Sequence, residues 1–203
     1  MNQSIEQLAE RIGGDLQKLE DLLKRCGDKR TKIRFPRGFL RTAAHFRERF
    51  WFIRDENLRR NIAYSLILSD VYRWLLNRTD LQGTAREMLI KECVCLMGSL
   101  AESITKDAMQ SFCGKKQGYA KRTAKMRELG IIDGALERKL DWLWDYRNRE
   151  HLFLIEDREY GHYTLEHYND AIGTFRALRK ALHEYFAQLA GLERAPQGVR
   201  AEF

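Results

Sequence analysis

The sequence predicts an all-α protein. Only two prolines, Pro36 and Pro196, occur in 203 residues, and proline is the residue that helix interiors tolerate least. Apolar residues recur at intervals of three and four, as in "SIEQLAERIGGDLQKLEDLLKRC", and this spacing is typical of one face of a helix rather than of a strand. A chain of this length can bury one substantial core. We therefore expect a helical bundle with an extension.

Residues 1–54 are expected to form a basic N-terminal extension, folded as a helical hairpin. The first helix should begin after Ser4, which suits the N-cap position, and end near Gly27. The second should start at about Pro36, because the fixed φ of proline suits the first turn of a helix. Its buried face would comprise Phe39, Ala43, Phe46, Phe50 and Ile53.

Residues 55–192 are expected to form the bundle itself, and residues 193–203 a frayed tail. Helical spacing predicts one helix after residue 57 and a long central helix whose apolar stripe runs from Leu89 to Phe112. Shorter helices should follow at residues 119–129 and after Asp133, a suitable N-cap, and the last helix should run from about 164 to 192.

Basic residues are clustered in two segments of a chain whose formal net charge is +7 and whose pI is about 9.3. Residues 24–49 contain ten Lys or Arg, and residues 115–127 contain six with no acidic residue. Such segments can neutralise the phosphates of a nucleic acid. The alternative is two solvated helix faces. The candidate nucleic-acid-binding residues are Arg30, Lys32, Arg34, Arg37, Lys115, Lys116, Lys121 and Arg122.

The sequence offers no pattern for a metal, a cofactor or a membrane. The four cysteines lack zinc-site spacing, since Cys93 and Cys95 are two residues apart on an expected helix and point to different sides. Cys93 is expected to pack in the core as a reduced thiol. The N-terminus lacks the apolar run of a signal peptide, and no stretch reaches the roughly 18 apolar residues of a membrane span. We expect a cytoplasmic protein.

The segment "DYRNREHLF", residues 145–153, carries the candidate site. Counting back from His151 along the helical repeat gives Arg147, Leu143, Leu140, Leu136 and Ile132, so the arginine and histidine continue an apolar face. A guanidinium at the edge of a core needs an acceptor or water. Either a cleft supplies it, or Arg147 pairs with a carboxylate of a neighbouring helix while Asn148 caps the helix and His151 binds its last carbonyls.

This region resembles the HEPN domains (higher eukaryotes and prokaryotes nucleotide-binding), which are small helical bundles. The resemblance covers roughly residues 55–192, and includes "ECVCLMGSLAESITKDAM", the lead into "DYRNREHLF", and "HYTLEHYNDAIGTFRALRKAL". The family motif is an arginine, then usually a polar residue, then a histidine after four to six intervening positions. Arg147 and Asn148 match its start, whereas His151 follows after three. A separation of four still places both side chains on one helix face.

The resemblance implies a metal-independent endoribonuclease without a cofactor, of the kind found in toxin–antitoxin and antiphage defence systems. It implies catalytic roles for Arg147, Asn148 and His151, RNA as substrate, a homodimer with two motifs lining one cleft, and an antitoxin or another protein as partner. Trp142, Trp144 and Tyr146 lie nearby; they can stack on bases, but we expect at least two of them to be packing residues.

Two other functions stay open. One is a non-catalytic HEPN-like module that binds a protein partner, a nucleotide or a nucleic acid. The other is a nucleic-acid-binding protein that uses its basic N-terminal hairpin, with a bundle that serves only for dimerisation.

Overall fold

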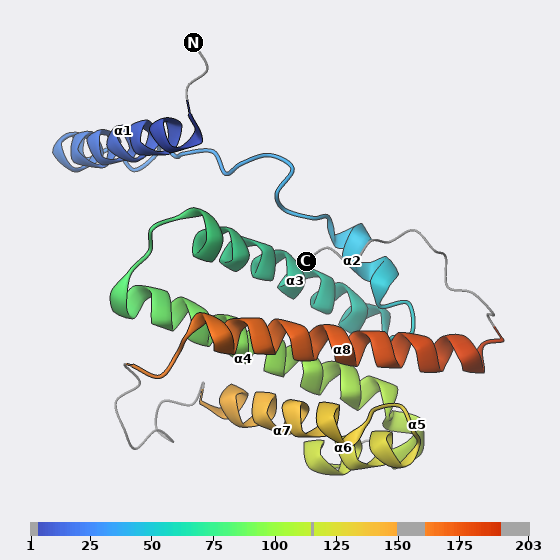
Figure 1. Cartoon of the computed structure of the whole chain (residues 1–203). Coiled ribbons are helices and arrows are strands. Elements are labelled where there is room, and N and C mark those ends of the chain that lie inside the picture. The colour runs from blue at the N-terminus through green and yellow to red at the C-terminus, as the bar shows by residue number, and fades with distance from the viewer. Residues whose placement is uncertain (1–3, 115, 150–160, 192–203) are drawn as a thin grey trace. The chain divides into compact units, whose positions relative to one another are not determined.

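The computed structural model describes residues 4–114, 116–149 and 161–191, and all regular structure in these ranges is helical (Figure 1). The prediction of an all-α helical bundle is therefore confirmed. The helices are α1 (Ile5–Cys26), α2 (Ala43–Arg49), α3 (Glu56–Arg78), α4 (Gly83–Ala108), α5 (Gln110–Cys113), α6 (Tyr119–Glu128), α7 (Gly134–Asn148) and α8 (Leu165–Leu189).

The chain divides into two units, residues 1–37 and residues 38–203. The first unit holds α1, whose N-cap is Ser4, as predicted: its hydroxyl accepts from the backbone N–H of Gln7, while the Gln7 side chain accepts from Ser4. Gly27 ends α1 in the left-handed conformation. No residue of α1 is buried, and Ile5 is 87% exposed. The apolar stripe of α1 is thus not part of a core.

The second unit begins earlier than the expected boundary at residue 54. Its first helix, α2, starts at Ala43 rather than near Pro36, and Thr42 is the N-cap that accepts from the backbone N–H of His45. Phe46 and Phe50 are almost fully buried in the core of the second unit. The apolar face expected for the second arm of a hairpin therefore packs on the bundle, which places residues 38–54 with the bundle.

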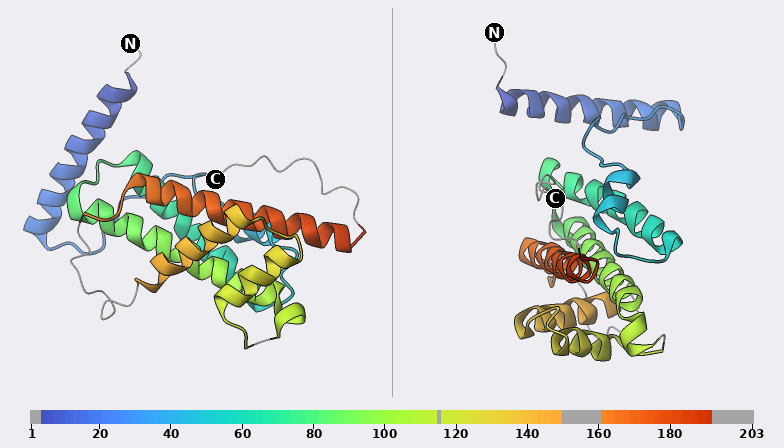
Figure 2. Two further views of the ribbon diagram at one scale, coloured as in Figure 1. Left: turned by 60° about the horizontal axis from the view of Figure 1, so that its bottom comes forward. Right: turned by 90° about the vertical axis from the view of Figure 1, so that its right-hand side faces the viewer.

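Helix α4 lies at the centre of the bundle, with α3 on one side, α6 and α7 on the other, and α8 running alongside it (Figures 1 and 2). More than one side of α4 is consequently buried: Cys93 and Cys95, although two residues apart, are both fully buried. The expected core position of Cys93 is confirmed, and burial raises the pKa of its thiol to about 12.

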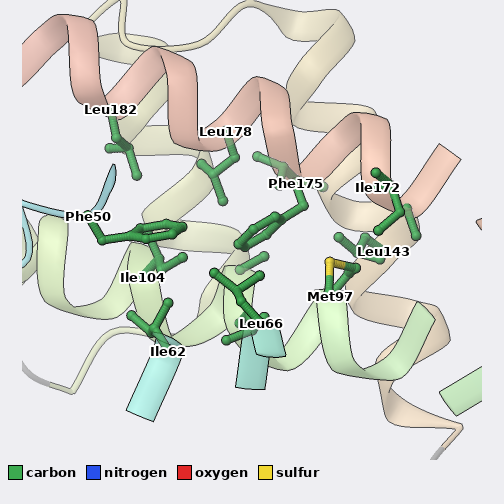
Figure 3. Packing of buried hydrophobic residues seen from close by; sticks show 14 of the residues in the cluster. Phe50, Ile62, Leu66, Met97, Ile104, Leu143, Ile172, Phe175, Leu178 and Leu182 are labelled. Atoms are coloured by element: carbon green, nitrogen blue, oxygen red, sulfur yellow. The ribbon is translucent and has the colours of Figure 1, made fainter. Parts of the chain in front are cut away.

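Helix α8 closes the core from the C-terminal part of the chain. Figure 3 shows Phe175, Leu178 and Leu182 directed at Phe50 and at the side chains beneath it. The rings of Phe50 and Phe175 lie 6.1 Å apart. Phe112, predicted at the end of the central stripe, is instead 39% exposed, because α4 ends at Ala108 and a separate turn, α5, follows.

Candidate functional site

Helix α7 carries Arg147 in its last turn. Asp133 is its N-cap, as predicted, and accepts from the backbone N–H of Leu136 at 2.7 Å. Leu140 and Leu143 are fully buried, and Arg147 follows them on the same face. The helix ends at Asn148. The prediction that Arg147 continues the apolar face of this helix is therefore confirmed.

The backbone of α4 comes unusually close to Arg147 at Gly98. A Cβ atom added to Gly98 would lie 2.6 Å from the Cβ of Arg147 and 2.9 Å from the carbonyl oxygen of Leu143. Carbon atoms in contact are normally about 3.5–4.0 Å apart, so only glycine permits this approach. The contact fixes the backbone of α7 at the position from which the Arg147 side chain extends.

Among the described residues, the guanidinium of Arg147 contacts Glu102, Trp144 and Asn148. Its Nη2 lies 3.2 Å from Oε2 of Glu102 on α4, and the two side chains are 24% and 28% exposed. Its Cζ lies 5.2 Å from the ring centre of Trp144, and Nη1 donates to Oδ1 of Asn148 at 3.4 Å. The Nε atom is buried and lacks a hydrogen-bond partner among the described residues. The carboxylate partner considered from the sequence is thus present, as Glu102.

The aromatic residues around Arg147 pack against the core. Trp144 stacks on Tyr119 of α6 with ring centres 4.7 Å apart, and the Tyr119 hydroxyl donates to the carbonyl of Leu140 at 3.3 Å. Burial raises the pKa of Tyr119 above its usual value. Trp142 and Tyr146 also contact the core. The prediction that at least two of the three aromatics near the motif are packing residues is confirmed.

The first turn of α8 anchors the end of α7 through His167. The backbone N–H of Thr164 donates to Nδ1 of His167 at 3.1 Å, so Nδ1 is an acceptor. The proton of the neutral ring therefore sits on Nε2, which donates to the Tyr146 hydroxyl at 3.0 Å. From α4, the Cys95 thiol approaches the Tyr146 carbonyl at 3.5 Å. Tyr146 is thus held from two helices beside Arg147.

Two predicted site residues, His151 and Lys115, lie outside the described residues. Among the other basic candidates, Arg30, Lys32, Arg34 and Arg37 are exposed in the first unit, and Lys116 and Lys121 are exposed in the second. Lys121 lines a groove of about 610 Å³ together with Phe112, Lys125 and Arg127.

Arg122 does not lie on the surface as a nucleic-acid contact would require. It is 5% exposed, an Nη atom donates to the carbonyl of Gln117, and its Cζ lies 5.7 Å from the Tyr119 ring centre. Burial lowers the pKa of its guanidinium. The position on α6 turns this side chain inward, whereas Lys121, one residue earlier, faces solvent.

Sequence reasoning did not single out Gly98 and Glu102, the two residues of α4 that position Arg147. A signal for Gly98 was available, since an isolated glycine within a helical pattern often has a packing reason. No sequence signal pointed to Glu102, because sequence spacing does not show which helices become neighbours.

Within the described ranges, no group of three or more His, Cys, Asp or Glu side chains is placed to hold a metal ion, and no helix there is long and apolar enough to cross a membrane. Comparisons with models of protein families, with curated proteins and with solved structures found no significant match to this chain.

Proposed function

We propose that this protein is a metal-independent endoribonuclease of HEPN type that acts in a toxin–antitoxin or antiphage system. The observation that carries the proposal is the placement of Arg147. Its backbone is fixed by Gly98, its guanidinium lies over Trp144, and its buried Nε lacks a partner among the described residues. A guanidinium held in this way is suited to bind a phosphate and to stabilise negative charge that develops on it.

The reaction is a transesterification at an RNA phosphate. The 2′-oxygen attacks phosphorus as its proton leaves, the bond from phosphorus to the 5′-oxygen breaks, and that oxygen takes up a proton. His151 moves these protons, because the pKa of histidine lies near working pH. Arg147 neutralises the phosphate, and Asn148, which accepts from Arg147, orients it. The products end in a 2′,3′-cyclic phosphate and a 5′-hydroxyl.

The proposed enzyme also needs basic residues that attract the RNA and a second copy of the chain. Lys116 and Lys121 are exposed and attract the RNA backbone. Two copies of the chain bring two motifs to one cleft, and an antitoxin or another protein controls the assembled enzyme.

A second candidate function is a non-catalytic helical module that binds a protein partner, a nucleotide or a nucleic acid. The ion pair between Arg147 and Glu102 favours it, because a carboxylate at 3.2 Å already neutralises the guanidinium. A variant of this candidate uses the first unit for nucleic-acid binding, with Arg30, Lys32, Arg34 and Arg37 exposed there as contacts.

The test is cleavage of a mixed pool of single-stranded and structured RNA in EDTA. We expect the wild-type chain to produce fragments with 2′,3′-cyclic phosphate ends, and Arg147→Ala and His151→Ala to produce none. Arg138→Ala is the matched control, because it removes the same charge from an exposed position of α7.

Cleavage that is equal in all four proteins would show a contaminating nuclease or a different active site. If none of the four cleaves, the non-catalytic module becomes the better description. Filter binding of the same RNA to the quadruple variant of Arg30, Lys32, Arg34 and Arg37 to alanine then tests the first unit. Loss of the salt dependence of binding would assign the contacts to that unit.

A further inference from the structure

Helix α1 in the first unit carries an apolar face that is left largely uncovered. Its residues are Ile5, Leu8, Ile12, Leu16, Leu19 and Leu23. None of them is buried, and Ile5, Ile12 and Leu16 are 87%, 49% and 42% exposed. Single exposed apolar residues are common on soluble proteins, but a continuous apolar face is normally covered. The face of α1 therefore indicates an interaction surface.

The sequence of α1 makes the helix dependent on such an interaction. Ser4 and Gly27 cap its two ends. Gly13 and Gly14, however, lie in its interior, where glycine is less stable than alanine. In proteins, most of the stability of a helix comes from the packing of its amphipathic face rather than from helix propensity. A partner on the apolar face would therefore stabilise α1.

The composition of α1 distinguishes between kinds of partner. Its acidic residues are Glu6, Glu10, Asp15, Glu20 and Asp21, and its basic residues are Arg11, Lys18, Lys24 and Arg25. Anionic lipid surfaces and nucleic acids attract helices with an excess of Lys and Arg, so neither is favoured here. The apolar face consists of Leu and Ile without an aromatic residue, which is typical of helices that pair with another helix. The expected partner of α1 is thus a helix.

A second copy of α1 matches this face better than the bundle does. Among the described residues of the second unit, the exposed large apolar side chains are Leu40, Tyr64, Leu68, Phe112, Leu165 and Leu189. Of these, only Tyr64 and Leu68 are neighbours on one helix face, a single turn apart on α3. They match about one turn of α1, whereas another α1 presents the same face over its full length.

The area of such a pairing is sufficient for a specific interface. Covering one Leu or Ile side chain removes on the order of 100 Å² of apolar surface from water. Pairing the apolar faces of two α1 helices therefore buries on the order of 1,000 Å² in total, which is about the size that a specific interface requires.

The spacing of the face suits two helices that pack along their whole length. The first three residues of the face recur eleven positions later as its last three. An eleven-residue repeat corresponds to about 3.67 residues per turn, close to the value of about 3.6 for a straight helix. Two copies of α1 can therefore stay in contact along the face with little supercoiling.

Charges beside the face favour a parallel pair. Arg11, Lys18 and Arg25 follow one another at intervals of seven along one side of the face, and Glu6 and Glu20 lie along the other side. In a parallel pair with twofold symmetry, opposite sides of the two helices meet, whereas like sides meet in an antiparallel pair. Basic residues consequently face acidic residues in the parallel pair, and face other basic residues in the antiparallel one.

Two residues beside the face have the opposite sign to their side, namely Asp15 on the basic side and Lys24 on the acidic side. Each is paired within the helix, since Lys18 lies 3.3 Å from Asp15 and Lys24 lies 3.4 Å from Glu20. The basic side then holds three basic residues against one acidic residue, and the acidic side two acidic residues against one basic residue. The two sides therefore keep opposite net charges.

We infer that α1 pairs with the α1 of a second copy of this chain as a parallel two-stranded helix dimer. Cys26 is the last residue of α1, is exposed, and continues the apolar face three positions after Leu23. A parallel pair brings the two Cys26 side chains together, whereas an antiparallel pair places them at opposite ends of a helix about 33 Å long. This interface belongs to the first unit and does not depend on the proposed ribonuclease activity of Arg147.

Sedimentation velocity of the full chain over a range of protein concentrations, under reducing conditions, tests the pairing. We expect a reversible dimer. Leu16→Glu places a charge at the centre of the face while keeping a good helix former. It should raise the dissociation constant of the dimer at least about tenfold, because the charge would be buried without a partner.

Gln7→Glu is the matched control for Leu16→Glu. It adds the same charge away from the apolar face, and glutamate at this position keeps the capping box with Ser4. We expect this variant to dimerise like the wild-type chain. All four tryptophans belong to the second unit, so unchanged tryptophan fluorescence in both variants would show that the bundle is intact.

Disulfide formation tests the orientation. In a chain that carries Cys113→Ser, Cys26 is the accessible thiol, because Cys93 and Cys95 are buried. Oxygen, with copper phenanthroline as catalyst, oxidises two neighbouring thiols to a disulfide. We expect a covalent dimer on non-reducing electrophoresis. Cys26→Ser should abolish this dimer, and Leu16→Glu should strongly slow its formation.

Three results would overturn the inference. A wild-type chain that stays monomeric at every concentration would show that α1 covers its own bundle or binds a different protein. A dimer that Leu16→Glu leaves unchanged would place the interface on the second unit. A dimer that Leu16→Glu weakens, but that forms no disulfide through Cys26, would refute the parallel orientation.

Discussion

Replacing Gly98 by alanine should destabilise the bundle, although the same replacement normally strengthens a helix. Alanine is favoured over glycine in a helix interior by about 1 kcal/mol. At Gly98, however, the new Cβ would lie 2.6 Å from the Cβ of Arg147 and 2.9 Å from a backbone oxygen. Relief of that overlap requires a shift of about 1 Å between α4 and α7 to reach ordinary contact distances.

The magnitude follows from two opposing effects. Overpacking of a well-packed core costs roughly 1–3 kcal/mol, and the gain in helix propensity offsets about 1 kcal/mol of it. Gly173→Ala isolates the second effect, because that glycine is also inside a helix but its added Cβ meets nothing within 4 Å. We expect Gly173→Ala to raise the free energy of unfolding by about 0.5–1 kcal/mol. Gly98→Ala should lie about 1–3 kcal/mol below it.

Urea unfolding followed by tryptophan fluorescence measures this difference. All four tryptophans, Trp51, Trp74, Trp142 and Trp144, belong to the second unit, so the signal reports on the bundle without a contribution from α1. Equal m-values for the two variants would show that the same surface is exposed on unfolding. Gly98→Ala as stable as Gly173→Ala would refute the close approach of α4 to Arg147, and with it the account of how Arg147 is positioned.

Two further predictions concern buried groups. Burial raises the pKa of the Cys93 thiol from 9.0 to about 12. As pH rises, the thiol therefore loses its proton in the unfolded chain before it does so in the folded chain. The free energy of unfolding should consequently fall above pH 9, by up to about 1.4 kcal/mol per pH unit. Urea titrations at pH 8, 9 and 10 should show this slope, and Cys93→Ala should reduce it; an equal slope in that variant would assign it to other groups. Asp70→Ala should lower the free energy of unfolding by about 3–5 kcal/mol, because it leaves Arg41 partly buried without its carboxylate. A loss below 1 kcal/mol in urea unfolding would contradict the importance of that pair.

Local features of the chain could be predicted from the sequence, because short-range chemistry determines them. Ser4, Asp133 and Thr164 were recognised as helix starts, and each lies directly before a helix. The apolar spacing before Arg147 likewise gave the correct face of α7. The helix start predicted at Pro36 was wrong. The helix begins at Ala43 with Thr42 as its N-cap, and residues 36–42 hold no helix.

Long-range features could not be predicted in this way. Arg147 and Glu102 are 45 positions apart, and only the packing of α7 on α4 brings them to 3.2 Å. Arg122 belongs to a run of basic residues that looks solvent-exposed in the sequence, but the position of α6 turns it inward against Tyr119.

The place of α8 in the chain has a consequence for how the protein is made. Helix α4 is complete at residue 108, but the side chains that cover one of its faces, and the face of Phe50, belong to residues 165–189. Phe52 likewise lacks its stacking partner until Phe186 is synthesised, because the two rings stack with centres 5.9 Å apart. During synthesis the ribosome therefore extends a chain whose central helix keeps an apolar face uncovered until its last helix emerges. Folding of the bundle is completed only after residues 165–189 emerge, and until then this face can aggregate with other apolar surfaces.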